Sequence, residues 1–374
     1  MTEAAEIVTE RWQDQWSMVP RYERWIESLG IPIHRSYFID DLRTIEVGPW
    51  EERECNAAIV VLTGQADFME TRVTEIPPAA TLPPFKFSLD DVIYVLSGHG
   101  LTTVWAEDGG VKRTFEWQPH SLFFIPKNYT YQLANAAGHE PARLFHYNYL
   151  PMTMSINIEP EYFFNNPALR PTVDILSEGS DIYSEAKLIS GSKHGTDWTA
   201  AFFPDLLLYD KIVSRDREGT VAPGHLRVCL PNVTSLRLGS HVLPAGTYKG
   251  AHYHGAGAVV LIPGGEGFSL MWPMNGDAND KMFVPWHEGS IFGPPNMWYH
   301  HHFNLGASEM RYLTLHPARH IEPDYHGSGI PFVEEDIATR QLFEAELAKR
   351  GLETQMPPEL YTDPHFRLKR PAEE

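Results

Sequence analysis

The chain lacks a cysteine framework. Only two of its 374 residues are cysteines, Cys55 and Cys229, and they lie far apart in the sequence. Neither belongs to a CxxC pair or stands beside a histidine, so the sequence predicts neither a disulfide scaffold nor a cysteine-based metal site. We expect both side chains to lie in the protein core.

A membrane span, a secretory signal and a basic surface are also missing from the sequence. No run of about 18 apolar residues is present, which argues against a membrane-spanning helix. The acidic first residues do not follow the charged-then-apolar order of a signal peptide. Lysine and arginine number 30 against 49 acidic residues, giving a net charge of −19. Because nucleic-acid binding needs a basic face, we do not expect a nucleic-acid partner. Without an apolar span or a signal peptide, we expect no membrane partner and a reducing, cytoplasmic location.

The composition still provides a sizeable core. Hydrophobic residues make up 43% of the chain and charged residues 21%, which is ordinary for a globular protein. The length suits two or three domains. From Cys55 onward, short β-rich runs alternate with glycine and proline, a pattern typical of a β-sandwich or barrel.

Histidines form the most informative pattern in the chain. His252 and His254 stand two residues apart in an expected strand, where alternate side chains share one face. Three consecutive histidines, His300 to His302, follow later in the chain. Imidazole suits zinc, copper, iron and nickel. The pattern therefore predicts a site for one divalent transition metal.

The spacing around these histidines resembles the two motifs of the cupin family. The first motif is matched by Gly246, His252, His254 and Gly265, with Ala258 or Val259 where the family has glutamate. The second motif is matched by Gly289, Pro295, His300 and Asn304, with Met297 in place of a glycine. The resemblance implies a cupin barrel in which His252, His254 and His300 hold the metal without the carboxylate. The competing interpretation is that these are buried histidines with no metal.

The first half of the chain carries a degenerate copy of the same motifs. Phe85, Phe87 and Tyr131 occupy the three histidine positions, offset by about 168 residues, and the other motif positions that are kept include Asp91, Gly98, Pro126 and Asn135. A repeat of domain length indicates duplication. We expect aromatic side chains to fill this barrel without a cation. The alternative is that its apolar interior binds a second ligand.

The sequence thus predicts an all-β protein of two tandem cupin barrels, of the jelly-roll or double-stranded β-helix type, with helical extensions at both ends. An amphipathic segment over residues 334–350, followed by Gly351, predicts the C-terminal helix. The expected parts are an N-terminal helical arm (1–50), a metal-free barrel (51–150), a linker (151–220), a metal-binding barrel (221–318) and a C-terminal helix and tail (319–374). Barrels of this kind are often dimers, so we expect a homodimer.

The other histidines near the second motif are further candidates. His302 shares a face with His300 on an expected strand, so it is a candidate catalytic base or substrate contact, or an inward polar residue bonded to a neighbour. His301 is expected to face away. The histidines after the last expected strand are assigned to the surface: His316, His320 and His326.

Three tryptophans surround the motifs in the sequence: Trp272, Trp286 and Trp298. Tryptophans near a small-molecule cavity commonly form its apolar wall, so these are candidate substrate-binding residues. Packing in the barrel core is the competing interpretation.

The expected chemistry follows from the open coordination of the metal. Three protein ligands leave positions for water, substrate or dioxygen. Three neutral imidazoles leave the metal charge uncompensated, which favours a small anionic substrate such as a hydroxy acid, keto acid, aromatic acid or thiol. Our first hypothesis is an Fe(II) dioxygenase that uses O₂. The alternatives are a non-redox isomerase, hydrolase or decarboxylase with Mn, Zn or Ni as a Lewis acid, and a ligand-binding protein without turnover. Cu is a further alternative for the metal of the site.

Overall fold

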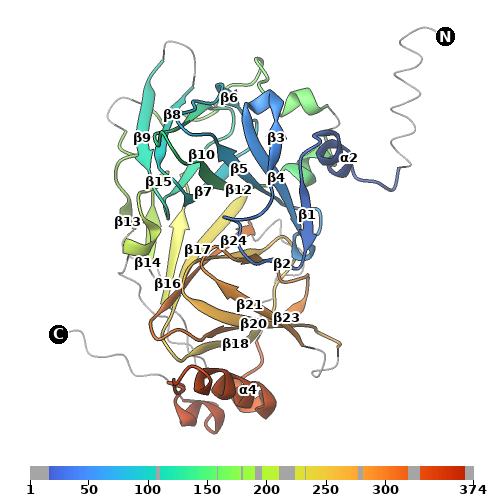
Figure 1. Ribbon diagram of the computed structural model, residues 1–374, viewed down its shortest axis with the longest axis vertical. Coiled ribbons are helices and arrows are strands. Elements are labelled where there is room, and N and C mark those ends of the chain that lie inside the picture. Colours follow the sequence, from blue (N-terminus) through green and yellow to red (C-terminus); the bar gives the residue numbers. More distant parts are fainter. Residues whose placement is uncertain are drawn as a thin grey trace.

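Two β-barrels are stacked along the long axis of the molecule, with the N-terminal barrel at the top of Figure 1 and the C-terminal barrel below it. The structure, a computed structural model, describes residues 17–106, 110–157, 159–177, 180–189, 196–209, 224–231, 233–276, 281–318 and 329–366. Each barrel packs a large sheet against a four-stranded sheet. The predicted all-β fold with two tandem barrels is confirmed.

The N-terminal barrel is built from alternating short strands. Its large sheet contains, in spatial order, β1 (Ile33–Ser36), β4 (Cys55–Leu62), β5 (Glu70–Ile76), β12 (Ala142–Asn148), β7 (Asp91–Ser97), β10 (Leu122–Ile125) and β15 (Phe202–Phe203), and β3 (Gly48–Trp50) pairs with β4. Its small sheet contains β6 (Phe85–Lys86), β11 (Thr130–Asn135), β8 (Gly100–Trp105) and β9 (Lys112–Trp117). In β9, Phe115 and Trp117 are buried and alternate with exposed residues, as the period of a strand requires.

The C-terminal barrel repeats this plan. Its large sheet contains, in spatial order, β13 (Lys187–Ile189), β14 (Thr196–Thr199), β16 (Gly224–Cys229), β17 (Leu236–Leu243), β24 (Met310–Pro317), β19 (Val259–Gly264), β22 (Ile291–Phe292) and β2 (Phe38–Ile39). Its small sheet contains β18 (Tyr248–His252), β23 (Trp298–Asn304), β20 (Glu266–Pro273) and β21 (Met282–His287).

An asparagine shows that the two barrels share one local design. Asn135 Nδ2 donates to three backbone carbonyls, and its Oδ1 accepts a hydrogen bond from the backbone N–H of Ala137. Asn304 makes the same set of bonds, including one from the N–H of Gly306. Each asparagine therefore ties a strand end to two neighbouring turns, which supports the duplication inferred from the sequence.

The barrels are joined by exchanged strands and a shared core. Strand β2 comes from the N-terminal segment but pairs with β22 of the C-terminal barrel, and β15 comes from the segment between the barrels but pairs with β10 of the N-terminal barrel. Tyr147 Oη donates to the carbonyl of Gly257 at 2.8 Å across the junction. Leu313 and Leu315 of β24 belong to the same buried cluster as the N-terminal core.

The described part of the N-terminal arm, residues 17–50, contains one helix followed by short strands. Helix α2 spans Arg21–Ser28 and packs against the short helix α3 (Leu150–Met154). Gly30, with a φ of +67°, ends the helical stretch, and β1, β2 and β3 follow. These strands form because open sheet edges are available to pair with them, which local residue preferences do not reveal. Residues 1–16 of the expected arm lie outside the described residues.

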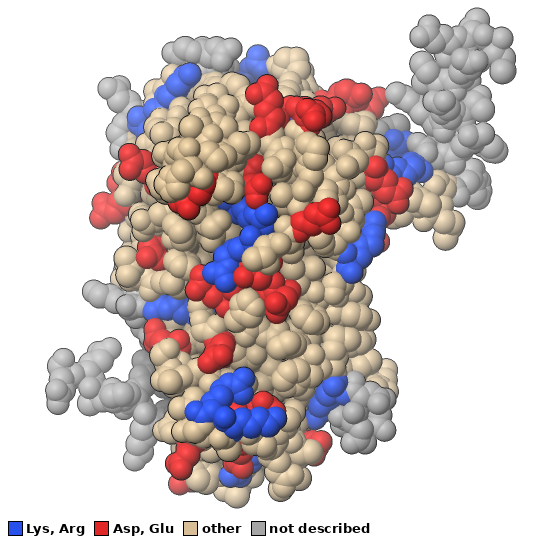
Figure 2. All heavy atoms as spheres, viewed as in Figure 1, with Lys and Arg blue, Asp and Glu red and all other residues tan. Residues whose placement is uncertain are grey.

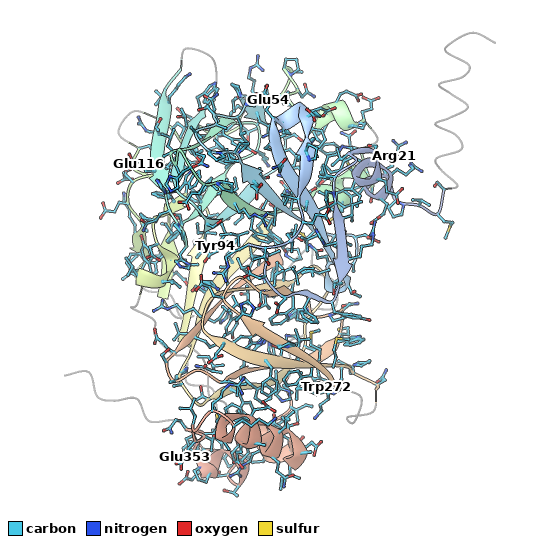
Figure 3. All side chains as sticks on the ribbon, viewed as in Figure 1. Arg21, Glu54, Tyr94, Glu116, Trp272 and Glu353 are labelled. Atoms are coloured by element: carbon cyan, nitrogen blue, oxygen red, sulfur yellow. The ribbon has the colours of Figure 1, made fainter. Side chains whose placement is uncertain are left out.

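The C-terminal segment covers the outer face of the second barrel. Helix α4 (Ile337–Ala348) lies across the far end of this barrel in Figure 1, inside the predicted range 334–350. Asp336 Oδ1 accepts a hydrogen bond from the N–H of Ala338 and caps the helix. Phe343 and Leu347 pack in a buried cluster with residues of the small sheet. We call residues 330–366 the C-terminal cap, and Glu353 in this layer is labelled in Figure 3.

The surface is mixed in charge on the face that Figure 2 shows. Lysine and arginine there lie among aspartate and glutamate, so this face has no continuous basic area of the kind that nucleic-acid binding needs. None of the helices in the described ranges combines the length and apolar character needed to cross a membrane.

Candidate metal centre

Two paired strands bring three histidines together inside the C-terminal barrel. His252 at the end of β18 lies opposite His300 on β23, and His302 follows on the same face of β23. One ring nitrogen from each of these three residues lies within 4.8 Å of the others. His252, His300 and His302, which we call the histidine triad, thus have the spacing of a metal site.

A bulge in β18 gives the site its lining. Lys249 pairs with His302 and His252 pairs with His300, so the register shifts between these two pairs. The extra residue turns both Lys249 and His252 toward the barrel interior. Gly250 lies in the bulge, where a Cβ would come within 3.2 Å of the Phe332 ring of the C-terminal cap.

Backbone carbonyls orient two rings of the triad. His252 Nδ1 lies 3.1 Å from the carbonyl oxygen of Gly250, and His300 Nδ1 lies 3.1 Å from that of Trp298. Because a carbonyl can only accept, each Nδ1 carries the proton and each Nε2 presents a lone pair. The Nε2 of His300 is buried and has no hydrogen-bond partner among the described residues. An orphaned imidazole nitrogen beside two others fits a divalent transition metal.

A hydroxyl orients the third ring. His302 Nδ1 lies 3.0 Å from Ser269 Oγ on β20, and Trp286 Nε1 on β21 donates to the same oxygen at 3.0 Å. All three residues are buried. The chain Trp286–Ser269–His302 therefore fixes the plane of the imidazole and leaves Nε2 to face the other two histidines.

The triad differs in one member from the set expected on the sequence. His254 was expected to share the face of His252, but β18 ends at His252 and the alternation of side chains ends with it. His254 Nδ1 lies 3.0 Å from the Gly255 carbonyl, and its ring lies 4.7 Å from that of His300 and 5.0 Å from that of His316. The structure thus places His254 beside the triad and puts His302 in it.

The surroundings keep the histidines neutral. Burial lowers the pKa of each triad residue well below 6.5, and the charge of Lys249 acts in the same direction on all three. Burial also lowers the pKa of His254 to about 4. Neutral imidazole is the form that binds metals, so the site is prepared for a cation at neutral pH.

Positive side chains face the same interior. Besides Lys249, Arg237 on β17 lies opposite His316 in the β17–β24 register, and its charge contributes to the low pKa of His254. Both cationic residues are half-buried. Among the described residues that face inward from β17 through β24, none is aspartate or glutamate. The interior of this barrel is therefore suited to anions.

Tyr312 faces the triad from the large sheet. Its ring centroid lies 5.0 Å from that of His302 and 4.5 Å from that of His241. Tyr312 is fully buried, and its hydroxyl has no hydrogen-bond partner among the described residues. Burial raises the pKa of Tyr312 far above 10, so the hydroxyl remains a donor. A ligand oxygen in the barrel would satisfy it.

The three candidate tryptophans lie in three different environments. Trp272 stacks on His301 and belongs to the buried cluster under the C-terminal cap, so it faces away from the triad. Figure 3 labels it on the lower barrel. Trp286 lies in the barrel core and reaches the site through Ser269. Trp298 is half-buried, on the same strand face as His300, and its ring lies 6.0 Å from that of Tyr37.

Two other histidines are more buried than the sequence predicts. His301 faces away from the triad, but it is buried and its Nε2 lies 2.6 Å from Glu335 of the C-terminal cap. His316 was expected at the surface, yet it is buried on β24 beside His254. The burial of His301 depends on the C-terminal cap, which the local sequence does not reveal. The burial of His316 follows from strand β24, which is longer than expected. His320 and His326 lie outside the described residues.

Sequence reasoning did not identify four residues that line or support the site: Lys249, Ser269, Arg237 and Tyr312. Alternation along the last strand could have found Tyr312, because Tyr312, Thr314 and His316 share one face. The inward position of Lys249 depends on the bulge, for which the sequence offers only a glycine.

Comparisons with known proteins support the fold. No protein-family model and no curated protein matches the chain. Solved structures do match. An oxalate decarboxylase studied for its substrate binding mode and a reaction specificity switch has a TM-score of 0.50 at 11% identity, covering 90% of this chain and 88% of that one.

Two further solved structures match with slightly lower scores. A Bacillus subtilis oxalate decarboxylase studied for its Mn(II) centres has a TM-score of 0.48 at 12% identity, covering 90% and 88% of the two chains. The vicilin of hazelnut (Corylus avellana) has a TM-score of 0.48 at 12% identity, covering 87% and 97%. At such identities the likeness shows the fold, and the predicted two-barrel cupin fold is confirmed.

Proposed function

We propose that the C-terminal barrel is the active site of a metal-dependent enzyme that acts on small carboxylates. The observation that carries this proposal is a neutral histidine triad beside inward-facing cations, with no inward-facing carboxylate among the described strands β17 to β24. A divalent cation held by neutral ligands keeps its full charge. Because the barrel wall has a low dielectric constant, that charge attracts an anionic ligand strongly.

The triad would hold the metal through its three Nε2 atoms. His254 is the alternative ligand, since its ring lies 4.7 Å from that of His300. When bound, a divalent transition metal supplies Lewis acidity to a substrate carboxylate and leaves coordination positions for the substrate. Mn(II) and Fe(II) are the ions to test first.

The surrounding residues would bind and orient the substrate. Lys249 lies opposite His302 and would hold a second carboxylate group by a charge-assisted hydrogen bond. Tyr312 Oη would donate its free hydrogen to a substrate oxygen. The apolar side of the interior, with Val260, Ile262 and Phe292, would exclude bulk water and so strengthen these polar contacts.

Decarboxylation is the reaction we propose first. The bond between the carboxylate and its neighbouring carbon breaks, CO₂ leaves and a proton takes its place, so no oxidant is consumed. An enzyme named oxalate decarboxylase shares the fold, and oxalate is a small dicarboxylate of the class that the cationic lining favours. This is the non-redox alternative among the functions considered from the sequence.

An Fe(II) dioxygenase is the second candidate. The observation in its favour is a ligand set of histidines without a carboxylate, which leaves positions for both substrate and O₂. Oxygen consumption separates this reaction from decarboxylation.

The test measures CO₂ release and O₂ uptake over a panel of small carboxylic acids that includes oxalate. Protein loaded with Mn(II) or Fe(II) is assayed under nitrogen and in air. The proposal predicts CO₂ release under nitrogen that His300→Ala abolishes, while His99→Ala, which removes an exposed imidazole from the N-terminal barrel, retains it. Activity only in air, with stoichiometric O₂ uptake, would establish the dioxygenase instead. Saturable binding without a product under either gas would show a binding protein.

A further inference from the structure

The interior of the N-terminal barrel contains a cation that the sequence did not predict. Arg53, in the 3₁₀ turn before β4, places its guanidinium carbon 3.3 Å from the centroid of the Phe85 ring. Phe85 and Tyr131 stand where the C-terminal barrel has His252 and His300. An arginine cation thus occupies the region of this barrel that corresponds to the metal centre of the other.

Arg53 has no carboxylate partner among the described residues. The residue is half-buried as a whole, but its Nη1 has no solvent contact and no hydrogen-bond partner. Burial lowers the pKa of Arg53, and the strongest opposing influence is Tyr131 rather than an acid. A buried charge normally has a counter-ion, because removing it from water is costly.

The nearby acids are already paired with other groups. Glu70 forms an ion pair with Arg72 and accepts hydrogen bonds from Tyr22 and Asn148. Asp91 accepts from His146 Nδ1 at 2.8 Å and from Asn148. Both carboxylates therefore have partners other than Arg53.

Further unsatisfied nitrogen atoms line the same hollow as Arg53. Four residues that line this hollow each have a buried nitrogen without a hydrogen-bond partner among the described residues: Trp50 Nε1, Arg53 Nη1, Arg72 Nε and His146 Nε2. The tryptophan and arginine nitrogens can only donate. His146 Nε2 is the one acceptor, because Nδ1 of that ring donates to Asp91. A water molecule has two acceptor sites, so it would leave one of the three obligate donors unsatisfied, whereas a halide can accept from all three.

The volume of the hollow limits the size of the ligand that it can hold. The hollow has a volume of about 10 Å³, which corresponds to roughly one water-sized sphere. Its walls include the side chains of Phe85, Phe87 and Leu133, so an organic acid does not fit. A halide ion is larger than a water molecule, so the half-buried Arg53 side chain would have to move outward to admit it.

We propose that the N-terminal barrel binds a chloride-sized monovalent anion between Arg53 and Arg72, with Trp50 as a further donor. The anion is the counter-ion of the buried Arg53. The two barrels then bind ions of opposite sign at corresponding places. This site is independent of the reaction proposed for the C-terminal barrel.

The first experiment locates bromide by anomalous diffraction from crystals of the full chain grown in sodium bromide. The result expected is a bromide peak in the hollow, within hydrogen-bond distance of Arg53 Nη1. A peak attributable to water, or no peak there, would overturn the proposal.

The second experiment follows the thermal unfolding midpoint in solution. Replacing gluconate by chloride at constant ionic strength should raise the midpoint by about 2–4 °C, because the anion binds only the folded state. Arg53→Gln should remove this response. Arg113→Gln is the matched control, since Arg113 donates to the Ser177 carbonyl on the outside of the same barrel, and it should keep the response.

Two outcomes of the second experiment would contradict the proposal. A chloride response that survives in Arg53→Gln would show that the anion binds elsewhere. A response that disappears in His300→Ala would assign the halide to the metal centre. If Arg53→Gln does not fold, the bromide position in the wild-type crystal decides the question alone.

Discussion

The two barrels of this chain share a framework and differ in what they enclose. In both, an asparagine ties the same strand end to its turns. In both, a tryptophan of the small sheet donates to a hydroxyl on the next strand, Trp117 to Thr102 and Trp286 to Ser269, each at 3.0 Å. These contacts lie at matching positions, so the framework does not depend on the contents of the barrel.

The difference lies in a few inward positions. Phe85, Tyr131 and Leu133 of the N-terminal barrel stand where the other barrel has His252, His300 and His302. In the second barrel the hydroxyl of the shared tryptophan–hydroxyl pair has a further partner, His302. The same frame therefore either packs an aromatic core or orients a metal ligand.

Charge is distributed oppositely in the two interiors. The N-terminal barrel buries the carboxylates of Glu70 and Asp91, and the matching positions in the second barrel are Arg237 and Ala258. The first barrel supplies its own cation for those acids through the Arg72–Glu70 pair, whereas the second has half-buried Lys249 and Arg237 and no inward-facing acid among the described residues of β17 to β24. The two interiors therefore differ in the charge of the residues at these matching positions.

The largest expected effect concerns metal content. His300→Ala should reduce bound metal from about one ion per chain to near zero, because it removes a central ligand, while the far-UV spectrum stays unchanged. Tyr131→Phe, at the matching position of the other barrel, should keep the full metal content. Elemental analysis after anaerobic reconstitution measures both. Loss of metal in Tyr131→Phe would show that the metal binds in the N-terminal barrel and would contradict our account.

The next effect concerns stability and should involve the N-terminal barrel alone. Arg72→Met leaves Glu70 buried without its cation, which should lower the free energy of unfolding by about 3–5 kcal/mol. Arg35→Met breaks a partly exposed pair with Glu23 and should cost about 0–1 kcal/mol. Denaturant titration gives both values. An equal loss of unfolding free energy in the two variants would show that the buried Arg72–Glu70 pair does not stabilise the barrel.

The supporting hydroxyl should matter for metal affinity in one barrel only. Ser269→Ala removes the group that orients His302, so the metal dissociation constant should rise about 10–100-fold. Thr102→Ala removes the equivalent hydroxyl, which has no histidine to orient, and should leave the constant unchanged. Competition with a chelator measures the two constants. An unchanged constant in Ser269→Ala would exclude His302 as a ligand.

The smallest effect is a pH dependence from the N-terminal barrel. Burial lowers the pKa of His146 below 6.5, so the unfolded chain binds a proton more readily than the folded one. The stability that His146 contributes is complete above pH 6.5 and is lost as the pH falls toward the folded pKa, by at most about 1.4 kcal/mol for each pH step of one. His146→Gln should flatten this decline. Denaturant titrations at pH 7 and pH 5 in which both proteins lose the same free energy of unfolding would contradict the assignment.

Much of the fold was predictable because it depends on local patterns. Short β-rich runs between glycines and prolines predicted the two barrels from Cys55 onward, and the helix α4 lies inside the segment predicted before Gly351. Strands β1 and β2 were not predicted, since they form by pairing with sheet edges far away in the sequence.

The site was predictable only in part, for geometric reasons. Motif spacing predicted His252 and His300 as ligands, and the structure brings these two residues together with His302, which alternation on β23 had placed on the face of His300. His254 follows the end of β18 at His252, so the alternation of a strand does not fix its direction, and its role as a ligand stays a prediction. Lys249 depends on a bulge, and Arg53 lies in a 3₁₀ turn whose residues follow no strand or helix period.

The most direct test of the account is anomalous diffraction at the absorption edge of the bound metal, on crystals of protein reconstituted under nitrogen. The account predicts one peak per chain, bonded to Nε2 of His252, His300 and His302 in the C-terminal barrel. A peak among Phe85, Tyr131 and Arg53, or no peak in protein that has been saturated with metal, would contradict it.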